Sequence, residues 1–234
     1  MGQITIRELE KLDFFEGIPQ DILQNLLNES TVASYKKKEV IFHSRTRTEF
    51  VYFVLSGEVM LYNLTKHGNR KVIFILGKGR LLNQSIVSKK PNALFGEAVC
   101  PVQALKIPEG VFLRLMEQCH ELTYSILREY ERNLWRMGHQ LKNTTGNMQT
   151  ERKIAAKLWK LGRDFGVETE EGVMVDIDLT ITLMADLVGV PRENVSRACK
   201  VLTDRGLIRY SSKRFILTDF DGLADFYKMW ERGI

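Results

Sequence analysis

The sequence has only three cysteines, Cys100, Cys119 and Cys199, in 234 residues. They are too few and too scattered for the disulfide framework of a small secreted domain or for a structural zinc site. The sequence therefore predicts no metal site, and it favours a reducing compartment, the cytoplasm. A cysteine that senses oxidation stays open as an alternative, because one accessible thiolate is enough for that chemistry.

Long apolar runs are also missing. No stretch approaches the roughly 18 to 20 apolar residues that a membrane-spanning helix requires. The N-terminal stretch MGQITIRELEKLDFF carries charges within its only apolar part, which is not typical of a secretion signal. Ile6 occupies the position at which an N-myristoylation motif has Ser or Thr, so we do not expect that modification. With 44% hydrophobic and 27% charged residues, we expect a globular protein without a membrane partner.

The motifs of the common enzyme classes are absent as well. The sequence has no phosphate-binding loop, no His-Glu metal motif and no recognisable arrangement around a Ser or Cys nucleophile. We therefore do not expect an enzyme.

Charge is nearly balanced overall but is distributed unevenly. The formal net charge is +5, and residues 148–234 hold 14 basic and 14 acidic residues. The segment from Arg192 to Arg214, however, contains seven basic residues and only two acidic ones. An anionic partner would therefore meet a local basic patch within a neutral domain.

The N-terminal part of the chain changes from a helical to a strand pattern. Residues 1–30 show apolar positions at helical spacing, interrupted near Pro19. From Tyr35 onward, glycine-containing turns separate short runs rich in β-branched and aromatic residues: VIF, FVYFVL, VMLYNL and KVIFIL. Several short strands at near-regular spacing indicate a β-sandwich or barrel, which we expect to end near Ile107.

Residues 110–142 then read as one helix. Apolar residues recur along it at coiled-coil spacing. They are Leu127, Tyr130, Leu134, Met137 and Leu141. One interpretation is a helix that packs only on its own sandwich. The other makes these five residues a dimer interface, which is favoured because charged residues at 128, 129, 131 and 132 lie opposite. The polar stretch 143–147 predicts a break and the domain boundary.

After the break, the sequence predicts a helix over 151–162, a polar connection over 168–172 and a strand in VMVDIDL. Two short helices follow, with a specific pattern between Ile181 and Lys200. Ala185 is small enough for a close helix crossing, Gly189 suits a turn with positive φ, and Val195 packs back on the first helix. A hairpin around Ser211 completes a winged helix-turn-helix.

The outward face of the second helix supplies candidate base-reading residues. Charged helix faces are usually solvated, and that interpretation is the alternative. Base reading is favoured because the face belongs to the helix turns that enter the major groove. There Arg can bond guanine O6 and N7, and Glu can accept from cytosine N4. The predicted DNA-contacting residues on this face, at the helix start and in the wing are Arg192, Glu193, Ser196, Arg197, Lys200, Thr182, Ser211 and Lys213.

From end to end the chain resembles the bacterial Crp/Fnr family, named for the cyclic-AMP receptor protein and the fumarate-nitrate regulator. The resemblance is densest in ERKIAAKLWKL and LMADLVGVPRENVSRACKVLTDRGLI, and moderate in VYFVLSGEVMLY. It implies an α+β fold with three parts. These are a cyclic-nucleotide-binding-like β-roll (a jelly roll) with N-terminal helices over 1–109, a long dimerisation helix and hinge over 110–147, and a winged helix-turn-helix domain over 148–234.

The resemblance also implies the partners of the protein. Double-stranded DNA, a second copy of the chain and RNA polymerase are expected, and the acidic stretch 168–171 is either a polymerase contact or a solvated loop. Arg192, Glu193 and Arg197 match the base-reading positions of the cyclic-AMP receptor protein, whereas Ser196 matches the fumarate-nitrate branch. Arg192 favours a TGTGA-like inverted repeat over a TTGAT-like one.

The sensor end departs from the family pattern. Where cyclic-AMP binders carry Gly-Glu and then Arg-Ser, this chain has Asn83-Gln84 and, with a one-residue gap, Asn92-Ala93. A buried cyclic phosphate would lack its counter-ion, so we expect an effector other than cyclic AMP. No cysteine precedes Cys100 to hold an iron–sulfur cluster, and no histidine matches a haem ligand, so no cofactor is expected.

An effector pocket is expected between the roll and the long helix, and it would suit an uncharged or aromatic ligand. Its candidate residues are Leu82, Gln84, Ser85, Asn92, Phe95, Trp135, Gly138 and His139. Three alternatives remain: a regulator that needs no effector, one controlled by thiol oxidation, or a ligand-binding module whose trihelical domain does not read DNA.

Overall fold

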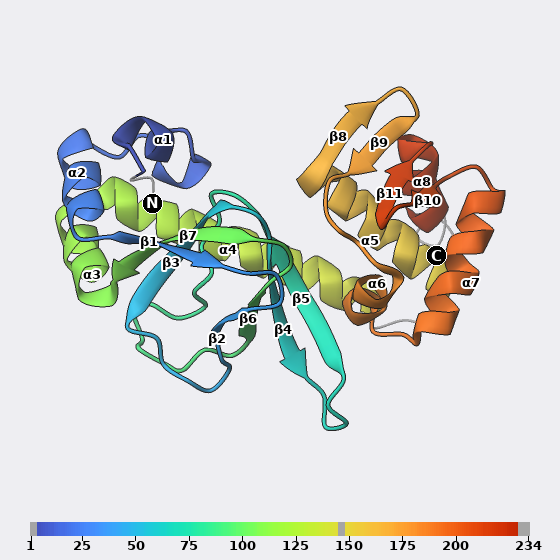
Figure 1. Ribbon diagram of the computed structural model, residues 1–234, viewed down its shortest axis with the longest axis horizontal. Coiled ribbons are helices and arrows are strands. Elements are labelled where there is room, and N and C mark those ends of the chain that lie inside the picture. Colours follow the sequence, from blue (N-terminus) through green and yellow to red (C-terminus); the bar gives the residue numbers. More distant parts are fainter. Residues whose placement is uncertain (1–3, 145–147, 229–234) are drawn as a thin grey trace. The chain divides into compact units, whose positions relative to one another are not determined.

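The computed structural model of the protein describes residues 4–144 and 148–228. The chain divides into two compact units, coloured along the sequence in Figure 1. The first consists of Met1–Asn63 with Ile73–Met137, and the second of Leu64–Val72 with Gly138–Ile234. Within the described ranges, no helix is both long and apolar enough to cross a membrane.

Two antiparallel sheets form the roll of the first unit, in the orders β1-β7-β3 and β2-β6-β4-β5. The strands are β1 (Thr31–Tyr35), β2 (Val40–Phe42), β3 (Phe50–Ser56), β4 (Val59–Leu64), β5 (Arg70–Leu76), β6 (Phe95–Ala98) and β7 (Val102–Pro108). Side chains from both sheets, including Val54, Leu61 and Ala104, form a core inside the roll. The four predicted apolar runs are all strands, and the sandwich ends where predicted.

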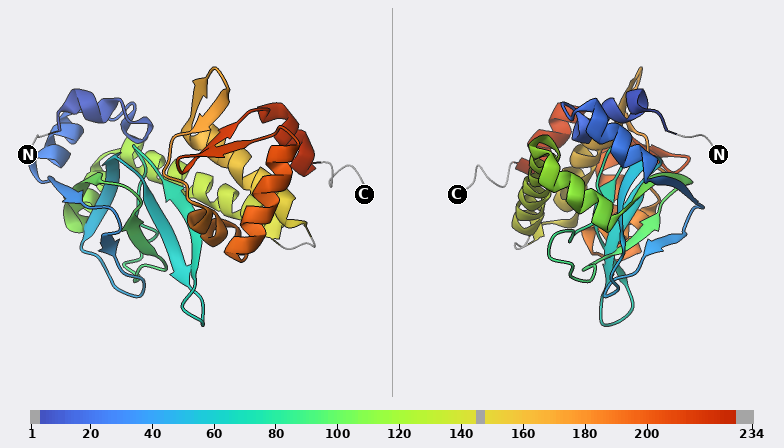
Figure 2. Two further views of the ribbon diagram at one scale, coloured as in Figure 1. Left: turned by 45° about the vertical axis from the view of Figure 1, so that its right-hand side comes forward. Right: turned by 90° about the vertical axis from the view of Figure 1, so that its left-hand side faces the viewer.

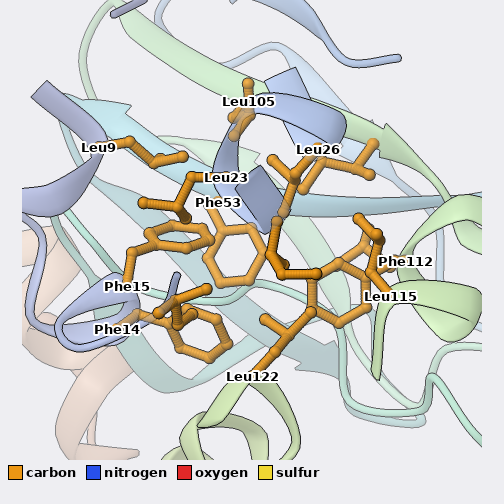
Figure 3. Close-up of a cluster of buried hydrophobic side chains, with 14 of the residues drawn as sticks. Leu9, Phe14, Phe15, Leu23, Leu26, Phe53, Leu105, Phe112, Leu115 and Leu122 are labelled. Atoms are coloured by element: carbon orange, nitrogen blue, oxygen red, sulfur yellow. The ribbon is translucent and has the colours of Figure 1, made fainter. Parts of the chain in front are cut away.

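A second core covers the other face of the β1-β7-β3 sheet, because successive side chains of a strand point to opposite faces. Phe53 of β3 lies at its centre, fully buried, with its ring centroid 4.5 Å from that of Phe14 and 5.9 Å from that of Phe112 (Figure 3). Each large apolar side chain buried in this way contributes about 1.5–3 kcal/mol. The covering helices are α1 (Ile6–Glu10), η1 (Asp13–Phe15), α2 (Gln20–Asn28), α3 (Glu109–Gln118) and the start of α4 (His120–Thr144).

The expectation of one continuous helix over 110–142 is wrong. Helix α3 ends at Gln118, and α4 begins at His120 after an extended residue, Cys119 (φ −133°). Cys119 and Leu122 are both buried in the second core, so the chain has to turn here to bring two helices onto one core. Helix α4 also runs on to Thr144, into the predicted break. The rest of that break, 145–147, lies outside the described residues.

The second unit packs helices against a four-stranded sheet of order β10-β11-β9-β8. Its elements are α5 (Thr150–Phe165), β8 (Gly166–Thr169), β9 (Gly172–Val175), α6 (Ile181–Val188), α7 (Arg192–Asp204), β10 (Arg209–Ser211), β11 (Arg214–Leu217) and α8 (Phe220–Lys228). The predicted polar connection 168–172 is largely part of the β8–β9 hairpin. Strand β9 ends at Val175 and not at Leu179, because successive tight turns, with Ile177 N–H donating to Val175 O and Leu179 N–H to Ile177 O, lead the chain out of the sheet.

Candidate DNA interface and sensor site

Helices α6 and α7 are joined by a short turn (labelled helices in Figure 1, other views in Figure 2), and the turn has the backbone conformation that its sequence predicts. Gly189 ends α6 with φ +75°, and its N–H donates to the carbonyl of Ala185 at 2.8 Å. This left-handed conformation favours glycine, which has no Cβ to clash. At the other end of α6, the Thr180 hydroxyl accepts from the N–H of Leu183 at 3.1 Å and caps the helix. The pair of short helices is therefore held at both ends by local contacts.

Packing of α7 on the rest of the unit determines which of its side chains meet solvent. Its buried residues are Val195, Ala198, Cys199 and Leu202. All five predicted base-reading residues of α7 lie on the other side and are exposed: Arg192, Glu193, Ser196, Arg197 and Lys200. Arg192 stands in the first turn, where the positive end of the helix dipole disfavours a cation, so helix stability does not explain its position.

One residue of this face was not predicted from the sequence. The Arg197 guanidinium donates from Nη2 to Oδ1 of Asn194 at 2.5 Å, one turn earlier in α7. The sequence signal that would have indicated this contact is an Asn three residues before an Arg on one helix face. Asn194 therefore orients the guanidinium while leaving its remaining donors available.

The wing is a tight hairpin tied to the helix-turn-helix. Ser212 and Lys213 both have positive φ, 50° and 64°, as in the two-residue turns that match the twist of paired strands. The carbonyl of Lys213 accepts from the N–H of Leu179 at 2.8 Å, next to the start of α6. Thr182, Ser211 and Lys213 are all exposed, as their predicted role requires.

Two cations of the sequence patch are already paired within the unit. Arg209 forms an ion pair with Glu171, and Arg214 forms one with Asp176. The patch available to an anionic partner is therefore smaller than the count of basic residues indicates.

The loop between β5 and β6 holds four of the eight predicted effector residues: Leu82, Gln84, Ser85 and Asn92. Asn83, which replaces the family's Gly, is 5% exposed and fixes the loop to β3. Its Oδ1 accepts from the N–H of Tyr52 at 2.8 Å, and its Nδ2 donates to the carbonyl of Phe50 at 2.9 Å. This amide therefore has a structural role.

The other polar residues of the loop also bond within the first unit. Gln84 donates to the Leu82 carbonyl at 2.9 Å and accepts from Leu94 N–H at 3.2 Å. Asn92 Nδ2 donates to the Thr46 carbonyl at 3.1 Å. Ser85 Oγ lies 2.7 Å from Ser88 Oγ, Leu82 is buried in the roll core, and the Phe95 ring stacks on Tyr62 at 5.1 Å.

The helix residues of the predicted pocket are exposed. Trp135 is 58% exposed, and Gly138 and His139 are exposed in the second unit. Two side chains of α4 contact the first unit itself. Tyr130 packs against the second core of its own chain, and burial raises the pKa of its phenol to about 12. Glu129, on the face opposite the predicted interface, is only 4% exposed.

Glu129 belongs to an ion-pair group that was not predicted from the sequence. Arg80, at the start of the loop, places Nη1 3.4 Å from Glu129 Oε2 and Nη2 3.5 Å from Asp13 Oδ2. The pairing joins η1, the loop and α4, whose residues are far apart in sequence, so no local pattern indicates it.

Buried charge in the roll unit is acidic. Glu97 and Glu129 are the two charged residues that are buried in the described parts of the chain. Tyr62 donates its hydroxyl proton to Glu97 Oε2 at 3.1 Å. Burial also raises the pKa of Tyr35 to about 12 and raises that of Tyr52, so both phenols stay neutral. Residues 4–144 and 148–228 contain no group of three His, Cys, Asp or Glu placed to hold a metal ion.

Comparisons with known proteins agree with this architecture. Residues 32–119 match the cyclic nucleotide-binding domain, and residues 152–226 match the Crp-like helix-turn-helix domain. The CRP-like cAMP-activated global transcriptional regulator of Mycobacterium tuberculosis (strain ATCC 25618 / H37Rv) is 23% identical over 217 residues, which cover 92% of this chain and 96% of that protein.

Two solved structures share the fold. A CooA mutant from Carboxydothermus hydrogenoformans has a TM-score of 0.74 and 17% identity, with 97% of each chain covered. FixK2 from Bradyrhizobium japonicum has a TM-score of 0.72 and 20% identity, with 84% of this chain and 96% of that chain covered. A cyclic nucleotide-binding domain followed by a Crp-like helix-turn-helix defines a transcriptional regulator. The chain belongs to the Crp/Fnr family, which confirms the predicted fold class.

Proposed function

We propose that the protein is a homodimeric regulator that reads a palindromic, TGTGA-like operator under the control of an effector other than cyclic AMP. It would act in the cytoplasm on double-stranded DNA and catalyse no reaction. The exposed face of α7, from Arg192 to Lys200, is the observation that carries this proposal. The domain division is proposed as 1–109, 110–147 and 148–234.

Base reading follows from the chemistry of that face. Arg192 and Arg197 can each bond guanine O6 and N7, and Glu193 can accept from cytosine N4. Thr182, Ser211 and Lys213 would contact phosphates and set the register. Two recognition helices would enter successive major grooves about 34 Å apart on an operator of about 22 base pairs.

Dimerisation is supported by an apolar stripe on α4. Leu127, Leu134 and Leu141 are 56%, 71% and 60% exposed and recur every seven residues. Exposed large apolar side chains in a row are typical of an association surface, and this spacing suits a helix of a second chain. Met137, 44% exposed, lies at the edge of the stripe, whereas Tyr130 is left out because it packs on its own core.

The effector is proposed to be uncharged or aromatic. One relative is named as cAMP-activated. Here the loop between β5 and β6 (the sensor loop) has its Asn83 amide bonded to β3 and its Gln84 amide bonded within the loop. The buried charges of the roll unit are acidic, which disfavours a buried phosphate. The effector would act by binding one of two conformations more tightly and so shifting their populations.

Thiol control is the weaker alternative. Cys199 and Cys119 are buried, and burial raises the pKa of both thiols, that of Cys199 to about 11. The half-buried Cys100 donates its S–H to Glu58 at 2.9 Å.

A contact with RNA polymerase is also proposed. The exposed acidic residues of the β8–β9 hairpin, Glu168 and Glu170, offer a surface for it.

Selection from a randomised DNA library tests the proposal, with and without a small-molecule cell extract. Enrichment of an inverted repeat only with extract supports an effector-controlled regulator, and fractionation of the extract then identifies the ligand. Enrichment without extract supports operator reading but contradicts the need for an effector. If no repeat is enriched under either condition, the base-reading role of α7 is wrong and the trihelical domain is structural.

A further inference from the structure

A pocket of about 430 Å³ lies in the second unit, apart from the proposed base-reading face. Its walls come from the first turn of α5, the C-terminal half of α7 and α8, and include Arg152, Val201, Arg205 and Phe226. None of the residues proposed to contact DNA lines it. The family-typical functions described above therefore leave this pocket without a role.

Two guanidinium groups meet the pocket without an acidic partner. The Nε atom of Arg152 is buried and forms no hydrogen bond with the described part of the chain. Arg205 lies over the Phe226 ring, 5.0 Å from its centroid, and forms no ion pair within residues 4–144 and 148–228. Both arginines of the wing strands, by contrast, are paired with carboxylates. A buried donor without an acceptor is unfavourable, so a ligand that supplies acceptors would bind here.

The start of α5 adds donors to the same pocket. This 16-residue helix has no side-chain cap at Gln149. The N–H of Arg152 donates to the Gln149 carbonyl at 3.1 Å, whereas the N–H groups of Thr150 and Glu151 have no intrahelical acceptor. The helix dipole favours an anion at this end. The unpaired guanidinium groups of Arg152 and Arg205 provide the counter-charge. Glu151 also lines the pocket, so two cations and one anion leave a net charge of +1 there.

We propose that this pocket binds a phosphate group, with Arg152 and Arg205 as its counter-ions. A phosphate has enough acceptor oxygens to bond two guanidinium groups and the first turn of α5 together. Val201 and Phe226 supply an apolar wall, and the volume leaves room for the rest of a phosphate ester. The inference rests on the proposed function in one respect, because α7 carries both Arg205 and the base-reading face. The phosphate comes either from a free compound or from the DNA backbone beside the operator.

Calorimetric titration of the full chain with inorganic phosphate, at constant ionic strength and without DNA, measures the affinity of the pocket for free phosphate. We expect saturable binding that weakens by about tenfold or more in Arg152→Gln and in Arg205→Gln. Arg163→Gln is the matched control, because Arg163 also lies over an aromatic ring, Trp159 at 5.1 Å, but does not line the pocket. Thermal melting checks that each variant is folded. Arg205→Lys, which keeps the charge, should bind phosphate more tightly than Arg205→Gln.

The salt dependence of DNA binding shows whether the pocket binds a phosphate of the DNA backbone. A slope of log affinity against log salt that falls by about one in Arg205→Gln assigns the pocket to the DNA backbone. An unchanged slope together with weakened phosphate binding assigns it to a free phosphate compound. Equal phosphate titrations and equal slopes in wild type and both pocket variants overturn the proposal. Operator selection by the wild-type protein would be unaffected in that case, so this failure differs from a failure of the proposed function.

Discussion

Arg197 and Lys213 are both exposed cations, but their positions predict different effects on DNA binding. Arg197 is oriented by Asn194 on the base-reading face, so Arg197→Ala should cost about 1–3 kcal/mol on the preferred operator and relax specificity at one position. Lys213 lies in the wing turn, so Lys213→Ala should weaken binding to all sequences and lower the salt slope by about one. Fluorescence anisotropy on matched and mutated duplexes measures both. A uniform loss in both variants would contradict the base-reading role of Arg197.

The buried thiol of Cys199 should make the stability of the helix-turn-helix domain depend on pH. Burial raises the pKa of its thiol from 9.0 to about 11, so the unfolded chain loses this proton at a lower pH than the folded one. Stability should therefore be unaffected by this group below pH 9 and should fall between about pH 9 and about pH 11. Melting temperatures of a Cys100→Ser, Cys119→Ser double variant measure the loss. Adding Cys199→Ala should remove this part of it, and an identical alkaline decline with and without the thiol would refute the assignment.

At the scale of elements, the sensor loop depends on one buried amide. Asn83→Ala leaves the Tyr52 N–H without its partner and removes one of two donors to the Phe50 carbonyl, which still accepts from the Thr48 hydroxyl at 3.2 Å. The unpaired buried N–H should cost about 1–3 kcal/mol. Urea unfolding of the full chain, followed in the first unit, measures the change. Asn25→Ala on the exposed side of α2 is the control and should have a much smaller effect. A stability equal to that of the control would mean that water replaces the lost bonds.

Elements with local determinants could be predicted from the sequence. Ala185, Gly189 and Val195 belong to one short segment, so the helix-turn-helix was recognisable from its spacing. The break between α3 and α4 at Cys119 could not be predicted, because no glycine or proline lies at this position. Its cause is the core that both helices share. The hydrogen bonds of the sensor loop could not be predicted from the sequence either. Asn83 bonds to residues of β3, and Asn92 bonds to the carbonyl of Thr46, which precedes β3, so the partners are distant in sequence.

Helix α4 presents opposite faces to different environments, and its exposed stripe predicts association. Leu134→Glu should favour monomers, because burying a carboxylate in an apolar coiled-coil contact is unfavourable. Sedimentation velocity measures the state. Arg128→Glu places the same side chain on the same helix away from the stripe and should remain dimeric. A dimeric Leu134→Glu variant would move the interface to another surface.

At the scale of the whole molecule, a dimer held through α4 predicts a fixed spacing of DNA half-sites. Inserting about five base pairs between the half-sites turns one of them to the opposite face of the duplex, because the helical repeat is about 10.5 base pairs. Inserting about ten restores the face but separates the half-sites by a further 34 Å or so, beyond the reach of a dimer with one fixed separation. Both insertions should therefore lower affinity to that of a single half-site, as measured by anisotropy on the selected operator. The Leu134→Glu variant should bind weakly and be indifferent to spacing. Wild-type binding that tolerates both insertions would mean that each chain binds its half-site independently.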